Sequence, residues 1–198
     1  MTRFVSLFRP ALLAAGGLLF VGNILTLGRP AKFSDAALTP MFEVSSALLL
    51  LGAIALLVAL VALHARQADQ VGGFGLFAAL IAGAGTVLFS GIGWSQTFLD
   101  PAAAKVVPAF LDADQPPAVL LVGFYLSLAL FALGWLLYAI ATLRAHVVGR
   151  VPSVVLLIGA ILALVPFLPV GQTIIGLSLL WLGLAPAAER VGRVVPAV

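Results

Sequence analysis

The most informative segment of the chain is the apolar run MFEVSSALLLLGAIALLVALVAL, residues 41–63. Glu43 is its only ionisable side chain, and the twenty residues that follow it carry no charge. An α-helix rises about 1.5 Å per residue, so about twenty apolar residues cross the roughly 30 Å hydrocarbon core of a bilayer. We therefore predict that 41–63 forms a transmembrane helix.

Five further stretches have a similar character. Prolines such as Pro10 and Pro117 stand near a first helical turn, where the missing N–H costs nothing, and Thr39 is placed to cap the helix that follows it. The six predicted spans are 10–28, 41–63, 74–93, 117–142, 152–168 and 171–187. The predicted fold is an all-α membrane protein, a compact bundle of six transmembrane helices in one polytopic domain covering residues 1–198.

The composition excludes several classes of protein. Hydrophobic residues make up 63% of the 198 residues and charged residues only 9%, whereas a soluble domain is roughly 45–50% apolar and about 25% charged. A soluble enzyme, a nucleic-acid-binding domain and a disordered chain are excluded, because each needs more polar surface. The absence of cysteine from the sequence excludes thiolate chemistry and cysteine-ligated metal centres.

The basic residues predict the orientation of the chain. If the N-terminus is inside, seven arginines lie on the inner side and only Arg29, Lys32 and Lys105 on the outer side, which agrees with the excess of basic residues in cytoplasmic loops. The inner residues are Arg3, Arg9, Arg66, Arg144, Arg150, Arg190 and Arg193. We predict N-in and C-in. Arginine outnumbers lysine eight to two, a bias typical of GC-rich bacterial genomes, so the predicted location is a bacterial cytoplasmic (inner) membrane.

Small residues follow one face of the third span. They recur every three or four positions and are Gly75, Ala79, Ala82, Thr86, Ser90 and Gly93. Small residues let helix backbones approach closely in lipid, where apolar surface alone gives no driving force. We predict that this helix is central in the bundle, and the alternative is a face that lines a pore.

Aromatic residues follow one face of the fourth span, namely Phe124, Phe131, Trp135 and Tyr138. Such a stripe is typical of packing against other helices or of a lipid-facing surface with interfacial anchors. A groove for a pigment, a quinone or a lipid tail would use the same residues, and packing is the favoured interpretation.

The two histidines, His64 and His146, end the second and fourth spans near the inner surface. Paired histidines on neighbouring helices can ligate a haem when their imidazoles face the interior of a bundle. These two stand beside Arg66 and Arg144 at the interface, so we predict no haem, no other cofactor and no metal.

Polar residues collect at a similar predicted depth in the outer half of the spans. The candidate outer-side pocket consists of Asn23, Glu43, Ser90, Gln96, Tyr125 and Gln172. The long loop 94–117 lies on the same side, and its Asp100-Pro101 pair predicts a short helix that ends before Pro108. Ordinary polarity at the level of the lipid headgroups gives the same pattern, so a pocket and a solvated rim both stay open.

Two classes of function follow from these features. The favoured one is a structural or accessory subunit that assembles in the bilayer with a membrane-protein partner or as a homo-oligomer, because the stripes suggest packing and no catalytic motif occurs. The alternative is a binder or transporter of a small apolar or lipidic molecule that enters from the outer leaflet. An enzyme is the least favoured class, since Glu43 is the only candidate acid or base beside a span, and no nucleic-acid partner is predicted.

Overall fold

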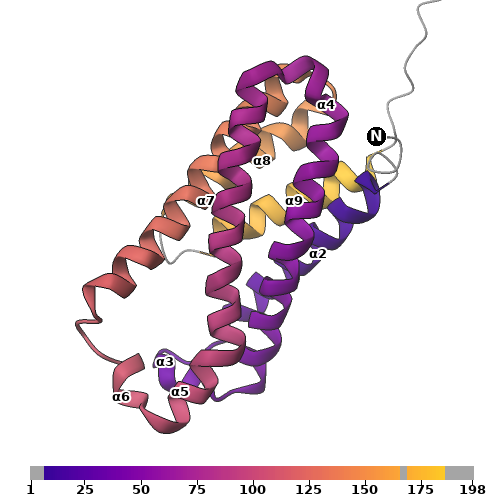
Figure 1. The fold of residues 1–198 in the computed structure, drawn as a ribbon. Helices are drawn as coiled ribbons and strands as arrows, with labels where there is room; N and C mark the ends of the chain where they lie inside the picture. Colours follow the sequence, from indigo (N-terminus) through magenta and orange to yellow (C-terminus); the bar gives the residue numbers. More distant parts are fainter. Residues whose placement is uncertain (1–6, 166–168, 186–198) are drawn as a thin grey trace, which may run out of the picture.

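The computed structural model describes residues 7–165 and 169–185, and these ranges are mostly helical with no strand. The longest elements are α2, α4 and α7, which are joined or followed by shorter helices (Figure 1). In chain order the elements are α2 (Phe8–Thr26), α3 (Phe33–Ala37), α4 (Pro40–Trp94), the π-helix η1 (Ser95–Leu99), α5 (Asp100–Val106), α6 (Pro108–Leu111), α7 (Ala118–Ala145), α8 (Arg150–Leu162) and α9 (Val170–Leu184).

Three helical runs are long and apolar enough to cross a bilayer. They are Phe8–Thr26, the continuous run Pro40–Val106 and Ala118–Ala145. Their length and composition are those of an integral membrane protein. Thr39 caps the second run as predicted, because its hydroxyl accepts a hydrogen bond from the backbone N–H of Phe42 at 3.2 Å.

The element α4 is a helical hairpin that turns at Gly72 (Figure 1). Gly72 has φ 56° and ψ −154°, a conformation that is essentially restricted to glycine. The first limb (residues 40–71) and the second limb (residues 73–94) then run antiparallel: Gly83 approaches Leu60, and Gly93 approaches Leu50. These pairs are almost symmetrical about Gly72. The spans predicted at 41–63 and 74–93 are thus two limbs of one helical run, with almost no loop between them.

The last two helices are shorter than predicted. Helices α8 and α9 contain 13 and 15 residues, or roughly 20 and 22 Å at 1.5 Å per residue, which is less than the roughly 30 Å hydrocarbon core. Helix α8 ends at Leu162, a few residues before Pro166, and the residue that precedes a proline is disfavoured in α-helix. Residues 166–168 and 186–187 of the two predicted spans lie outside the described residues.

Several contacts identify one end of the bundle, here called the Gly72 end. The Arg66 guanidinium lies 4.5 Å from the ring of Phe8, and that of Arg144 lies 5.5 Å from the ring of Phe74. The start of α2 and the end of α7 therefore meet the Gly72 turn. Arg9 also donates a hydrogen bond of 2.8 Å to the carbonyl of Ala185, which brings the end of α9 to the same place.

The opposite end, here called the capped end, carries the short helices α3, α5 and α6 (Figure 1). The predicted short helix before Pro108 is α5, although it continues from η1 and Asp100 is not its cap. Instead, the Asp100 carboxylate accepts a hydrogen bond from the Ser95 hydroxyl at 3.0 Å. A small apolar cluster, made of Ala36, Ala37, Phe42 and Ala104 with Leu111, joins these helices to the first limb of α4.

The middle of the predicted small-residue stripe packs against α7, at Ala82 and Thr86, whereas Gly93 approaches Leu50 on the first limb of α4. Gly75, Ala82, Thr86 and Gly93 are buried, whereas Ala79 and Ser90 are half-buried. Ala78, which lies beside the predicted stripe, is fully buried as well, so the buried face is wider than the sequence pattern indicated.

The aromatic stripe of α7 packs against that face. Phe131, Trp135 and Tyr138 are fully or almost fully buried, and Phe124 is half-buried. The indole N–H of Trp135 donates a 3.0 Å hydrogen bond to the hydroxyl of Thr86. Both stripes are thus occupied by packing within the chain.

Candidate functional site

A cavity of about 390 Å³ lies toward the capped end of the bundle. This volume is within the range of about 300–1,000 Å³ that is usual for small-molecule sites. Helices α2 and α7, both limbs of α4, η1 and α9 all contribute to its wall. The lining residues are Asn23, Thr26, Leu27, Arg29, Leu49, Phe89, Ile92, Gly93, Gln96, Phe124, Leu128, Pro169 and Gln172.

The structure brings together three of the six residues of the candidate outer-side pocket. Asn23, Gln96 and Gln172 come from α2, η1 and α9 and line this one cavity. Asn23 is 4% exposed, and its amide donates a 2.8 Å hydrogen bond to the carbonyl of Leu19. The carbonyl oxygen Oε1 of Gln172 is buried and has no hydrogen-bond partner among the described residues.

The other three residues of that set lie elsewhere. Glu43 is exposed in the first turn of α4, and the described residues show no ion pair between it and Arg29 or Lys32. The Ser90 hydroxyl donates to the carbonyl of Val87 at 2.6 Å, and Tyr125 is 43% exposed. None of these three side chains lines the cavity.

Arg29, which follows α2, supplies the positive charge of the cavity wall. Its Nη2 donates hydrogen bonds to the hydroxyls of Ser45 and Ser46 at 2.6 and 3.2 Å, and its guanidinium carbon lies 4.3 Å from the centre of the Phe42 ring. Its Nε is buried and has no partner among the described residues. Burial lowers the pKa of the Arg29 guanidinium, but arginine stays charged at physiological pH.

The remaining wall is mostly apolar. Six large hydrophobic side chains take part, namely Leu27, Leu49, Phe89, Ile92, Phe124 and Leu128. Phe89 is held in place because its ring stacks on that of Phe131 with centroids 4.6 Å apart. The cavity therefore combines a few polar groups with apolar walls, which is the usual composition of a site for an amphiphilic molecule.

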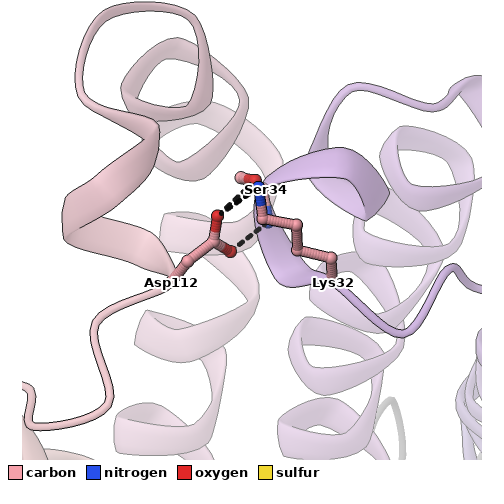
Figure 2. A network of polar contacts seen from close by, with 3 residues as sticks. All are labelled: Lys32, Ser34 and Asp112. Atoms are coloured by element: carbon pink, nitrogen blue, oxygen red, sulfur yellow. Dashed lines mark hydrogen bonds and ion pairs between the residues drawn. The ribbon is translucent and has the colours of Figure 1, made fainter.

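At the capped end, polar contacts of Asp112 link the end of α6 to the start of α3 (Figure 2). Its carboxylate accepts hydrogen bonds from the hydroxyl and the backbone N–H of Ser34, at 2.6 and 3.0 Å, and lies 3.3 Å from the Lys32 ammonium. The Ser34 hydrogen bonds, with help from Lys32, lower the pKa of the Asp112 carboxyl. These contacts are therefore complete above its ordinary pKa and are lost as the pH falls through the lowered value.

A second polar cluster lies near the Gly72 end. Gln67 is fully buried, and its amide donates a 3.0 Å hydrogen bond to the hydroxyl of Thr142. The His64 ring is 6.4 Å from that of Tyr138, while His146 is exposed at the end of α7 with φ 52°. Over residues 7–165 and 169–185, no three His, Asp or Glu side chains are grouped so that they could hold a metal ion.

Sequence reasoning missed two polar residues, Arg29 and Gln67. The sequence marks Arg29 as a charge that sets topology and as a possible partner of Glu43, whereas in the structure it binds the hydroxyls of Ser45 and Ser46 near the start of α4. Gln67 lies three positions after His64, in a polar segment that resembles a loop. Its position one helical turn after His64 was the only local signal that both belong to one helix face.

We compared the chain with protein-family models, curated proteins and solved structures, and none of these comparisons gave a match.

Proposed function

We propose that this protein binds a small amphiphilic molecule in the cavity at the capped end, as a membrane-embedded binder or carrier. The observation that carries the proposal is the cavity itself, in which the charged and polar groups of Arg29, Gln96 and Gln172 share one wall with large apolar side chains. A lipid-like molecule satisfies both kinds of surface, since its head replaces hydration of the polar groups and its tail covers the apolar wall.

We further propose a six-span arrangement, N-in and C-in, in one domain in a bacterial cytoplasmic membrane. In this arrangement the two limbs of α4 cross separately, and the short pair α8–α9 forms the last two spans. Arg9, Arg66 and Arg144 gather at the Gly72 end, which supports an inner location for that end. The cavity then opens in the outer half of the membrane, where a molecule enters from the outer leaflet.

This orientation predicts an all-or-none difference in chemical labelling. A cysteine placed at the exposed Lys105 of the capped end reacts with a membrane-impermeant thiol reagent in intact cells. A cysteine at the exposed Arg150, where α8 begins, reacts only after permeabilisation. The sequence contains no native cysteine, so the wild-type protein is the negative control and should not be labelled. Labelling of Arg150→Cys in sealed cells would reverse the orientation.

The proposed binding is tested by purification in a mild neutral detergent followed by native mass spectrometry. We expect the protein to retain about one amphiphile per chain, because the cavity of about 390 Å³ is near the lower end of the range for single small-molecule sites. Extraction and mass analysis then identify the molecule. A protein that retains only exchangeable detergent in the cavity contradicts the proposal.

A second candidate function is a structural or accessory subunit. It is favoured by the outer half of α7, where large apolar side chains such as Val119, Val122 and Leu126 are 76%, 65% and 53% exposed. A membrane-protein partner or a second copy of the chain would cover this surface, as would lipid. The small-residue and aromatic stripes do not support this function, because most of their residues are buried within the chain. A protein that co-purifies in stoichiometric amount, without an amphiphile, would favour it.

A further inference from the structure

The charge of Arg29 is not balanced by a carboxylate within the described residues. Within the described residues, the ion pair of the capped end joins Lys32 to Asp112, and the polar and ring contacts of Arg29 are with two hydroxyls and one aromatic ring. A cation taken partly out of water is costly unless an anion or several hydrogen bonds replace its hydration. Neutral hydroxyls satisfy part of its hydrogen-bonding capacity but none of its charge.

The arrangement around Arg29 leaves one side of the guanidinium available. The serine hydroxyls bind Nη2 and the Phe42 ring covers one face of the guanidinium. Within the described residues Nε is buried without a partner, whereas Nη1 is neither buried nor hydrogen-bonded. Guanidinium groups bind carboxylate and phosphate oxygens through charge-assisted hydrogen bonds, which are about twice as strong as neutral ones. An anionic oxygen in the cavity would balance the charge of Arg29 and accept a hydrogen bond from the accessible Nη1.

The position of this group is fixed by its neighbours. Ser45 and Ser46 are fully buried, and the Ser45 hydroxyl itself donates to the carbonyl of Phe42 at 3.0 Å. Phe42 belongs to the apolar cluster of the capped end and meets the ring of Phe33 edge-on at 5.6 Å. The guanidinium is thus preorganised, so a ligand loses little free energy in ordering it.

We infer that the cavity selects an amphiphile with a net anionic head, a phosphate or a carboxylate, which binds at Arg29 while the tail covers the apolar wall. The inference rests on the proposed function and adds the chemical class of the ligand. The unpartnered amide oxygen of Gln172 lies in the same wall. That amide accepts from a hydroxyl of the head or, when turned over, donates to another of its oxygens.

The test compares two single-chain lipids that differ in net charge. The delipidated protein in a neutral maltoside detergent is titrated with oleoyl lysophosphatidylglycerol, which is anionic, or oleoyl lysophosphatidylcholine, which is zwitterionic, and adducts are counted by native mass spectrometry. The wild type should bind the anionic lipid about tenfold more tightly or better, as expected for one charge-assisted contact. Inorganic phosphate, which lacks a tail, should not displace it at the same concentration.

The variants assign this preference to one residue. In Arg29→Gln the affinities for the two lipids should agree within about twofold. Arg29→Lys should keep most of the preference for the anionic lipid, because the positive charge remains. Lys105→Gln removes a cation from the same end of the bundle but not from the cavity wall, and it should keep the full preference.

The outcomes distinguish a failure of the inferred anionic head from a failure of the proposed amphiphile binding. If the wild type binds both lipids with equal affinity, the inferred preference for an anionic head is wrong and the proposed function stands. This comparison uses the wild type alone, so it does not depend on the folding of a variant. Displacement by inorganic phosphate alone assigns the site to a soluble anion and overturns the amphiphile. Failure of both lipids to bind overturns the proposed function itself.

Discussion

Replacing Gly134 with alanine should destabilise the bundle by about 1–3 kcal/mol, the typical cost of overpacking a closely packed interior. A methyl group at Gly134 of α7 would lie 2.5 Å from the backbone nitrogen and Cα of Ala82 on the second limb of α4. Backbone atoms cannot turn aside as a flexible side chain can, so the two helices must move apart. The Trp135–Thr86 hydrogen bond beside this contact would be stretched with them. The measurement is thermal unfolding in detergent.

The matched control for this substitution is Gly123→Ala on the same helix. An added methyl group at Gly123 meets no atom within 4 Å, so this variant should unfold at the wild-type temperature or slightly above it, because alanine favours helix over glycine. Equal unfolding temperatures for Gly134→Ala and Gly123→Ala would contradict the close crossing of α4 and α7.

Replacing Gly72 with alanine should also cost about 1–3 kcal/mol, in this case through backbone strain alone. A methyl group at Gly72 meets nothing within 4 Å, but the residue has φ 56° and ψ −154°, where a Cβ is strongly disfavoured. Gly73 also has open space around it and no positive φ, so Gly73→Ala should leave the unfolding temperature nearly unchanged. If both alanine variants behave alike, the hairpin turn of α4 is not made by Gly72.

The position of the turn shows what the sequence could not reveal. The segment HARQADQVGG, residues 64–73, is polar and ends in two glycines, so it resembles a loop between two spans. In the structure it stays helical as far as Gly72, since Gln67 is buried and bonded to Thr142 of α7. That contact joins residues 75 positions apart, and no local pattern predicts it.

The membrane helices themselves were largely predictable, because they depend on local features. Runs of apolar residues and the Thr39 cap gave the starts of α4 and α7 to within a residue or two. The lengths of α8 and α9 were less predictable. Their sequences are apolar beyond the helix ends, and hydropathy alone does not show where a helix stops.

Only part of the cavity lining could be predicted from the sequence. The sequence groups Asn23, Gln96 and Gln172 by their similar predicted depth, and in the structure all three line one cavity. Glu43 has the same depth but is exposed. Successive residues of a helix are rotated by about 100°, so Phe42, Ser45 and Ser46 face inward together while Glu43 faces away. Only the packing of the helices determines which face is inside.

If the cavity at the capped end holds an amphiphile, as we claim, a bulky side chain that fills the cavity should displace that molecule. Ile92 lines the cavity and Val87, on the same limb of α4, does not and is 54% exposed. Native mass spectrometry of the purified Ile92→Trp and Val87→Trp variants compares the retained amphiphile per chain with that of the wild type. We predict that Val87→Trp retains the wild-type amount and that Ile92→Trp, folded to the same thermal stability, retains almost none. Undiminished amphiphile on Ile92→Trp would contradict the claim and place the molecule elsewhere on the bundle.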